Sequence, residues 1–567
     1  MNRALGAPLI VLLLGALLAG GCGSGSGQSA TGQSLIYHYL PVDQVDPQRI
    51  SDGEGFAGEN LLEGLVTPNA TGTGVVPATA DSWQVSRGGT VYTFHIRKDA
   101  RWSDGTPVTA SDFEWTYRRL LKPSTSSTGG NLNGESSYSD LGIKNAVAFQ
   151  LGQATAWSKV GVKALDASHL RIVLAAPNTA FLQGMAEPPM VALPEKNLTR
   201  HPFDWQTSAH WVGNGPFIMR SFTPNSRMVL VPNPHYWDRR AVHLTRLTVT
   251  MAPATEEQLR RQYVQRKVDV ALLADPQAFA SDPAVAHAVT SLPEFSVQFL
   301  NLIPSRNPAL EDVRVRKAIA FAIDRAAVAK VSPVIKPSTS LVPDTLPGFD
   351  AGVGFRPNLA EARRLLAEAG YPSGKGFPTF IVMTYGFDPF IQVVLRSLHR
   401  ELGIRAVQDV EDPTVYDARR FEVLPASRVG YFFNGYSAIL DWRDWVSHLY
   451  PPSQTELLSL RPDDYTHYQV LQARGTATSV AAATAFLDAH ASPQSKRFAA
   501  VTAVADRTAD ATLSTELYKR AAAIRQGTYE FIPFAYRSLT FAIRPGAKGI
   551  HLRTGSLMIS FKGVRVG

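Results

Sequence analysis

The sequence contains one cysteine, Cys22, among 567 residues. A single thiol cannot form a disulfide within the chain, and it cannot supply the paired cysteines of a structural zinc site. Charged residues are also sparse, at 18% of the chain, and 56 Lys and Arg against 48 Asp and Glu give a formal net charge of +8. Because no dense basic run with interleaved aromatic residues concentrates that charge, we expect no nucleic-acid partner.

Common signatures of catalysis are absent as well. The 13 histidines are scattered, and the sequence has no H-E-x-x-H zinc motif, no G-x-S-x-G nucleophile motif and no P-loop. The segment Gly352–Gly354 lacks the further glycine of a dinucleotide-binding loop. We therefore expect no catalytic residue, no metal site and no cofactor. A secreted hydrolase is the alternative from a different functional class.

The chain begins with a short basic segment, an apolar run from Pro8 to Ala19, and the small residues Gly20 and Gly21 before Cys22. This pattern is typical of a secretory signal, and the run is too short for a membrane span of ~20 apolar residues. The cysteine after the small residues resembles a bacterial lipobox, which implies cleavage before Cys22 and lipid attachment to its sulfur. The alternative is an ordinary signal peptide with an incidental cysteine.

These features predict a lipoprotein signal peptide over residues 1–21 and a flexible Gly/Ser tether over residues 22–33. A tether behind a lipid anchor keeps a globular body near a membrane surface. We therefore expect the protein at the cell membrane, lipid-anchored on its extracytoplasmic face.

The stretch Trp102–Phe113 has a well-specified local pattern. It follows an alternating run, Val91–Arg97, that predicts a strand, and residues 104–107 (D-G-T-P) supply turn chemistry. Hydroxyl and carboxylate groups over residues 109–112 then precede a helical apolar pattern. We interpret Asp104 and Asp112 as turn and cap residues and not as a catalytic pair.

Further along the chain, several elements are predicted from periodicity and capping chemistry. Residues 42–58 are predicted to form a polar loop, followed by a helix over Glu59–Leu65. The clearest helix is predicted over Asp312–Lys330, with Asp312 as its cap and Arg314, Arg316 and Lys317 on a solvated face. Asn358 is expected to cap a helix over Leu359–Ala369 that stops at Gly370. The length of the chain predicts two or three lobes.

Four segments occur in an order and at a spacing that resemble a known family. They are Leu62–Val66 (L-E-G-L-V), Val76–Trp83 (V-P-A-T-A-D-S-W), Tyr92–Arg97 (Y-T-F-H-I-R) and Trp102–Ala110 (W-S-D-G-T-P-V-T-A). Gly213–Phe217 (G-N-G-P-F), Val229–Trp237, Val297–Asn301 and the segment ending at Tyr371 continue the resemblance, and residues 524–541 resemble a returning strand. Together they resemble the extracellular solute-binding proteins of ABC importers, in the family that contains dipeptide-, oligopeptide- and nickel-binding proteins.

The resemblance implies an α/β fold that is two-lobed and periplasmic-binding-protein-like (Venus-flytrap), with mixed sheets flanked by helices. It places lobe I at residues 34–58, 195–296 and 525–567, an extra amino-terminal subdomain at 59–194, and lobe II at 297–524. The implied function is capture of a small peptide or similar solute by a monomer and its delivery to an ABC permease. A non-peptide ligand, such as a nickel chelate or a sugar, is the alternative.

The resemblance also points to a ligand-binding segment at Gly435–Trp445. In peptide-binding members, an aspartate in a "G-W-x-x-D-Y" segment pairs with the ligand's α-ammonium group. Here Tyr436 stands in place of the first Trp, two extra residues precede Asp441, and Trp442 stands in place of Tyr. We expect Asp441 to pair with the amine, with Asp444 as the second candidate. The alternative is that both carboxylates are loop or cap groups beside Arg443.

Two further residues are candidates for contact with the ligand. Phe56 lies in a glycine-rich segment that matches a stretch near the ligand in the family, and its alternative is a flexible surface loop. Arg428 precedes a strand-like run and could meet a ligand carboxylate as a bidentate fork, the alternative being an ordinary surface arginine. Trp211, beside Gly213, is interpreted as an aromatic residue that packs within a lobe.

Overall fold

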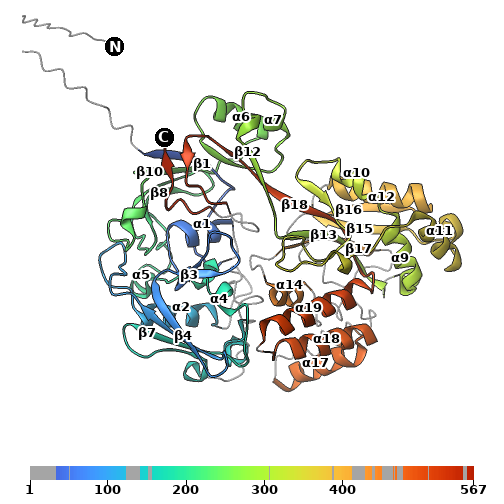
Figure 1. Ribbon diagram of the computed structural model, residues 1–567, viewed down its shortest axis with the longest axis horizontal. Helices are drawn as coiled ribbons and strands as arrows, with labels where there is room; N and C mark the ends of the chain where they lie inside the picture. The colour runs from blue at the N-terminus through green and yellow to red at the C-terminus, as the bar shows by residue number, and fades with distance from the viewer. Residues whose placement is uncertain are drawn as a thin grey trace, which may run out of the picture. The chain divides into compact units, whose positions relative to one another are not determined.

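A long mixed sheet connects distant parts of the chain (Figure 1). Its main path has the strand order β16-β15-β17-β13-β18-β11-β1-β10-β9-β8, and β12 and β14 also pair with β18. The bounds of these strands are Ala406–Glu411 (β16), Phe380–Tyr385 (β15), Arg428–Tyr436 (β17), Ser296–Leu302 (β13), Phe531–Ile543 (β18), Val270–Leu273 (β11), Ser34–His38 (β1), Arg246–Thr250 (β10), Arg227–Pro232 (β9), Phe217–Thr223 (β8), Val289–Pro293 (β12) and Ile335–Pro337 (β14).

The computed structural model describes residues 33–49, 52–122, 141–150, 156–304, 307–385, 388–411, 428–436, 441–449, 464, 467–468, 477–508, 510–552 and 559–567. The predicted signal peptide, tether and Cys22 lie outside the described residues. Residues from Gln33 to Gly567 belong to one compact unit. The predicted α/β class, with mixed sheets flanked by helices, is confirmed. The predicted boundaries of lobes and subdomain stay predictions.

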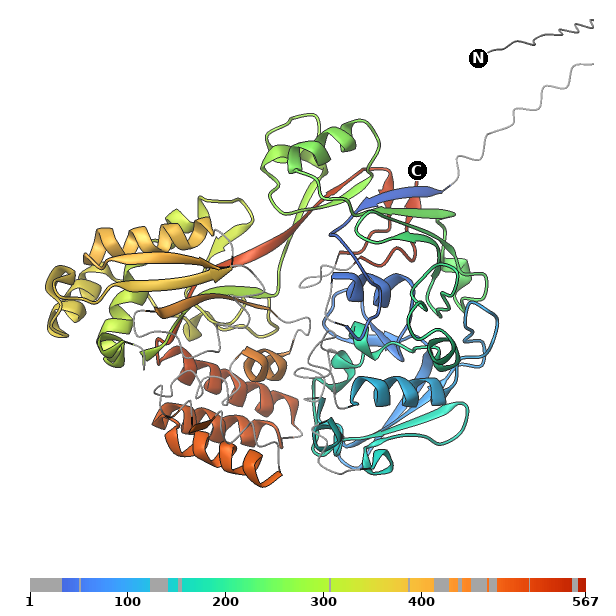
Figure 2. The same cartoon turned by 180° about the vertical axis from the view of Figure 1, so that it is seen from behind.

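The 13-residue strand β18 joins two groups of strands in this sheet (Figure 2). Its first half pairs antiparallel with β13 and β14, and its second half pairs antiparallel with β11 and β12. Nearly all of its residues are buried, as expected for a strand covered on both faces. The predicted returning strand is therefore confirmed from Phe531, although Ile524 lies in the preceding helix α19 (Ala511–Gln526).

A separate four-stranded sheet packs with the segment Trp102–Phe113, which follows its strand β5. Its order is β4-β5-β7-β6, with bounds Ala80–Ser86 (β4), Val91–Ile96 (β5), His169–Val173 (β7) and Val162–Ala164 (β6). Helix α2 (Ala110–Leu120) buries Phe113, Tyr117 and Leu120 against this region. Asp104 accepts a hydrogen bond from Thr106 N–H at 2.9 Å, and Asp112 accepts one from Thr109 N–H at 2.8 Å. Both are turn and cap residues, as predicted.

Several helices share one hydrophobic cluster with β13, β15 and β18, and four of them contribute most of its helical residues. They are α9 (Val313–Ala322), α10 (Arg325–Ala329), α11 (Leu359–Glu368) and α12 (Pro389–Leu402). Asp312 caps α9 and Asn358 caps α11, both as predicted. The prediction of one helix over Asp312–Lys330 is wrong, because α9 ends at Ala322 and Ile323 has an extended backbone. Asp324 then caps α10, where its carboxylate accepts a hydrogen bond from Ala327 N–H at 2.9 Å.

The solvated basic face predicted for this region is wrong at one position. Arg314 is exposed and pairs with Asp312 at 2.6 Å. Arg316, by contrast, is only 8% exposed and donates to the carbonyls of Thr528, Leu310 and Glu311 at 2.6–3.1 Å. Burial lowers the pKa of Arg316, and the three carbonyls supply the partners that a buried guanidinium requires.

A second set of helices forms another cluster around Phe295, Phe299 and Phe531. It contains α14 (Trp442–Leu449), α18 (Pro493–Ala505) and α19, and α17 (Ala477–His490) stacks beside them in both views (Figures 1 and 2). The sequence showed little pattern over residues 471–506, because this region is rich in alanine, serine and threonine. Small residues allow close helix packing but leave a weak apolar periodicity.

The amino-terminal loop prediction also needs correction. Helix α1 occupies Asp52–Asn60, where a polar loop was expected, and no helix covers the predicted range up to Leu65. Phe56 and Ala57 are buried, and a Cβ at Gly58 would lie 2.8 Å from Pro188 Cβ. The glycine therefore serves close helix packing and not loop flexibility.

The remaining elements are short. They are β2 (Val66–Pro68), β3 (Val75–Pro77), α3 (Ala146–Gln150), α4 (Phe181–Gly184), α5 (Glu195–Arg200), α6 (Glu256–Val264), α7 (Gln277–Ala280), α8 (Pro308–Glu311), β19 (Ala547–Lys548), β20 (Arg565–Val566) and the 3₁₀ turns Trp157–Lys159, Pro188–Met190, Arg239–Ala241, Ala286–Ala288, Ala351–Val353 and Pro372–Gly374. Among the described residues, none of the helices combines the length and apolar character needed to cross a bilayer.

Candidate functional site

Asp441 lies at the start of helix α14, shortly after strand β17 ends at Tyr436. Its Oδ1 accepts a hydrogen bond from the backbone N–H of Arg443 at 2.8 Å, and its carbonyl accepts one from Trp445 N–H at 3.0 Å. The residue is partly exposed. The cap role, one of the two alternatives for Asp441, is therefore confirmed, whereas contact with a ligand stays a prediction.

Two buried tryptophans fix the first turn of α14 behind this carboxylate. Trp442 is 3% exposed, and its Nε1 donates to the carbonyl of Pro347 at 2.8 Å. Trp445 is fully buried, donates to the carbonyl of Leu341 at 3.0 Å and meets the ring of Phe295 edge-on. Trp442 thus packs into the protein interior, and a role for it in ligand contact stays a prediction.

Arg443 belongs to a charged cluster with two other helices. Its Nε donates to Asp506 at 2.9 Å, and the Tyr518 hydroxyl donates to the same oxygen, Asp506 Oδ1. Burial and the neighbouring Asp506 carboxylate raise the pKa of Tyr518, so its hydroxyl keeps the proton that it donates. The cluster links α14 to the end of α18 and to α19, and the side chain of Arg443 is engaged by Asp506.

Arg428 and Tyr436 occupy opposite ends of β17, where they stand beside Ile381 and Ser296. Eight steps of roughly 3.3 Å separate them, which is about 26 Å along an extended strand. Their side chains and that of Asp444 lie outside the described residues, so their ligand contacts stay predictions.

Phe56 is placed in a different cluster. It is 3% exposed in α1, and its ring centroid lies 5.8 Å from that of Tyr39. The expected glycine-rich loop is therefore wrong for this segment, and ligand contact by Phe56 stays a prediction. Trp211 is 8% exposed and stacks on Trp205 with centroids 5.6 Å apart, which confirms its packing role.

Several of the family-like sequence motifs meet at the buried carboxylate of Glu63, which the sequence did not indicate as a site. Glu63 Oε1 accepts from the Tyr236 hydroxyl, and Oε2 accepts from Trp237 Nε1 at 2.7 Å and from the Thr79 hydroxyl at 3.0 Å. Asn214 bonds both backbone groups of Glu63, at 2.8 and 3.0 Å. Burial raises the pKa of Glu63, while these hydrogen bonds and Lys562 act in the opposite direction.

This Glu63 cluster is covered by cations. The guanidinium carbon of Arg97 lies 3.4 Å from the ring centroid of Trp237, and Lys562 Nζ lies 4.7 Å from the same ring. A glutamate, a Tyr-Trp pair and a Gly-Asn-Gly turn in three separate motifs are signals that can be read from the sequence. Their convergence is visible only in the fold.

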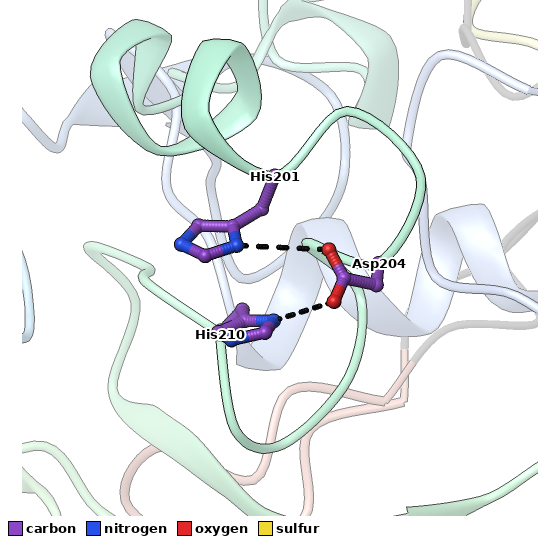
Figure 3. Close-up of side chains that lie close together, drawn as sticks. All are labelled: His201, Asp204 and His210. Carbon is purple, nitrogen blue, oxygen red and sulfur yellow. Dashed lines mark ion pairs between the residues drawn. The ribbon is translucent and has the colours of Figure 1, made fainter.

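Figure 3 shows a second group that sequence reasoning missed. His201, Asp204 and His210 each offer a ligand atom within 4.8 Å of the others. Nδ1 of His210 lies 2.9 Å from Asp204 Oδ2, and Nδ1 of His201 lies 3.6 Å from Asp204 Oδ1. The spacing His-x₂-Asp-x₅-His is present in the sequence, but it differs from the H-E-x-x-H zinc motif.

The arrangement of strands is shared with solved binding proteins. The structure of the Escherichia coli murein tripeptide binding protein MppA matches with a TM-score of 0.73 at 22% identity, covering 95% of this chain and 99% of that one. The fold is therefore that of the two-lobed α/β binding proteins.

The sequence comparisons define the family. Residues 74–444 match the model of bacterial extracellular solute-binding proteins, family 5 Middle, and the chain belongs to this family. The chain is similar to the Periplasmic murein peptide-binding protein MppA of Escherichia coli K12, with 30% identity over 65% of this chain and 70% of that protein. It is also similar to the Probable deoxycholate-binding periplasmic protein YgiS of the same strain, with 30% identity over 58% of this chain and 61% of that protein.

Proposed function

We propose that this protein captures a peptide-like solute outside the cytoplasm and delivers it to an ABC permease. The proposal rests on family membership and on the match in fold, over 95% of the chain, to a murein tripeptide binding protein. Its work is binding, closure and docking, with no covalent step. Ligand shifts a population from an open to a closed form, and the permease binds the closed form.

The proposal also includes a monomeric state and attachment to the outer face of the membrane through lipid on Cys22. The support for the anchor is the sequence of the first 33 residues, in which small residues precede the cysteine and a Gly/Ser segment follows it. Tethering keeps the receptor near its permease, which raises their effective concentration.

Asp441 is the proposed partner of the α-ammonium group of the solute. Its backbone is fixed by the hydrogen bond from Trp445 N–H, and the indoles of Trp442 and Trp445 anchor the helix that it caps. A carboxylate held on a rigid element loses little further freedom on binding, which favours affinity. A desolvated ammonium group needs such a charged partner.

Peptides with and without a free amino terminus test this function. Thermal unfolding of the full chain is measured with a panel of tripeptides, the same tripeptides acetylated at the amino terminus, and buffer alone. We expect free tripeptides to raise the thermal midpoint, since ligand at 100 times Kd adds about 2.7 kcal/mol of stability. Acetylated tripeptides should give little shift. Mass spectrometry of small molecules that co-purify with the natively expressed protein identifies the solute class independently.

A second candidate is a non-peptide solute, because one relative at 30% identity is a probable deoxycholate-binding protein. Deoxycholate is therefore included in the same assay. A thermal shift with deoxycholate and none with any tripeptide would replace the peptide proposal with this one. Turnover of a peptide or ester, abolished by a single acid substitution, would instead favour the secreted hydrolase.

A further inference from the structure

We propose that His201, Asp204 and His210 form a binding site for a divalent transition-metal ion. The three residues lie in one ten-residue loop that follows helix α5, and their ligand atoms converge within 4.8 Å (Figure 3). Among the residues that the structure describes, no other group of three His, Cys, Asp or Glu side chains meets this condition. The proposal does not depend on the solute that the protein carries.

Backbone contacts hold this His–Asp–His loop in shape. The N–H groups of Asp204 and Trp205 donate to the carbonyl of His201, and that of His210 donates to the carbonyl of Thr207. Asn197 Nδ2 donates to the carbonyl of His210 at 2.8 Å, which ties the end of the loop to α5. A loop fixed in this way presents its ligands without a large ordering cost.

Two tryptophans anchor the same loop in the hydrophobic core. Trp205, next to Asp204, is 4% exposed, and Trp211, next to His210, is 8% exposed. Their rings stack with centroids 5.6 Å apart. The side chains of His201, Asp204 and His210 are 25%, 52% and 33% exposed, so an ion from solution can reach them. The backbone beside them is held by the two buried tryptophans.

The contacts among the three side chains leave a nitrogen without an aligned partner. His210 Nδ1 is shielded from water and lies 2.9 Å from Asp204 Oδ2, but the direction is unsuitable for a hydrogen bond, and the nitrogen has no other partner among the described residues. The imidazole rings of His201 and His210 stack with centroids 3.8 Å apart and planes 16° apart. A metal ion bound between the rings would give the unpartnered nitrogen of His210 a ligand bond.

The donor set selects the class of ion. Two imidazole nitrogens and one carboxylate oxygen suit Zn²⁺, Ni²⁺ or Cu²⁺, while Mg²⁺ and Ca²⁺ prefer oxygen donors alone. Three protein ligands leave a coordination position for water, as in open zinc sites. A metal must lie near the plane of each ring, so binding requires the stacked rings to turn about their Cβ–Cγ bonds.

Calorimetric titration with zinc tests the site. The full chain is purified in detergent, stripped of metal with EDTA, dialysed, and titrated with ZnSO₄ alone. We expect binding of one Zn²⁺ ion per chain at this site, and we expect His210→Ala and His201→Ala each to weaken it about tenfold or more, since even outer-shell partners are worth ~10–100-fold. Asp204→Asn, which keeps the side-chain shape, should also weaken binding.

His169→Ala is the matched control, because His169 pairs with Asp166 at 2.9 Å on the surface but belongs to no three-ligand group. Its affinity for Zn²⁺ should equal that of the wild type. The thermal midpoint of each metal-free variant reports folding, and Asp204→Asn decides the question if a histidine variant unfolds. No binding of Zn²⁺ by the wild type, or equal affinity in the wild type and the Asp204→Asn variant, would overturn the proposal.

Discussion

Glu63 and Tyr236 lie 173 residues apart, and the hydroxyl of Tyr236 donates a hydrogen bond to the buried carboxylate of Glu63. The same carboxylate accepts from Thr79 and Trp237, and Asn214 bonds the backbone of Glu63 on both sides. These residues come from the separate segments by which the sequence resembles its family. The motifs, which lie far apart in the sequence, therefore meet in one buried hydrogen-bond network.

Replacing Glu63 with alanine should destabilise the protein strongly. The change leaves the donors of Tyr236, Trp237 and Thr79 without their acceptor, and each unsatisfied buried donor costs ~1–3 kcal/mol. We expect the thermal midpoint to fall by roughly 3 °C or more, at ~1 °C per kcal/mol for a folded unit of this length. Glu516→Ala is the control, since Glu516 is 60% exposed and pairs with Lys519 at the surface. Equal midpoints for the two variants would contradict the structural role.

Arg325 gives a second stability test. Its guanidinium is buried and donates to the carbonyls of Ser338, Pro533, Ala320 and Ile323 at 2.7–3.3 Å. Arg325→Ala should therefore lower stability by about 3 kcal/mol, because several buried carbonyls lose their donor. Arg314→Ala, which removes an exposed arginine from the adjacent helix, should cost ~1 kcal/mol or less. Urea unfolding followed by tryptophan fluorescence compares the two, and a reversed order would refute the assignment.

Asp324 should make stability depend on pH. The bond from Ala327 N–H, together with Arg400, holds the pKa of Asp324 below its usual value of 3.8. A carboxylate with a depressed folded-state pKa stabilises the protein above 3.8, and this stabilisation is lost as the pH falls through the folded-state pKa. Asp324→Ala should cost ~1 kcal/mol at pH 7 through loss of the cap. The difference in thermal midpoint from the wild type should shrink as the pH is lowered below 3.8. A difference that stays constant at these pH values would argue against a charged cap.

The binding role of Asp441 can be separated from its cap role with asparagine. Asn caps a helix as well as Asp does, so Asp441→Asn should keep the bond to Arg443 N–H while removing the charge. We expect the affinity for a free tripeptide to fall by about 2–5 kcal/mol, since the bound ammonium group loses its partner. Asp510→Asn, at the cap of α19, is the matched control and should bind like the wild type. An unchanged dissociation constant in Asp441→Asn would reject the amine contact.

Substitution of Cys22 tests the anchor. Without the thiol, no lipid can be attached, so Cys22→Ala should move from the membrane fraction to the soluble fraction when cells are fractionated. Ser24→Ala, two residues along the tether, should stay with the membranes. Retention of Cys22→Ala in membranes would show that another segment holds the protein there.

Local features were predictable because their partners lie within a few residues. Asp104 bonds Thr106, Asp112 bonds Thr109, and Asn358 bonds Glu361, each through chemistry that a short stretch of sequence displays. The candidate site was predictable only in part. Asp441 could be placed at a helix start, but the burial of Trp442 depends on Pro347, which lies 95 residues away.

The break in the predicted helix over Asp312–Lys330 shows where prediction from local sequence patterns fails. Its apolar pattern continues past Ile323, so sequence alone favours one helix. In the fold, Arg325 donates to the carbonyls of Ala320 and Ile323, which a continuous helix would need for its own N–H groups. Asp324 then caps the next helix. The long-range contact of Arg325 with Pro533 on β18 fixes this arrangement.

By itself, the sequence determined the family and the local turns and caps at Asp104, Asp112 and Asn358, and it predicts a lipid anchor at Cys22. These properties depend on order and spacing along the chain. The tertiary structure alone decided which charges are buried, as for Glu63, Arg316 and Arg325, and which side chains converge, as for His201, Asp204 and His210. The physical reason is that burial and convergence depend on residues that packing brings close together. A charged side chain can be buried only where hydrogen-bonding or charged partners replace its contacts with water.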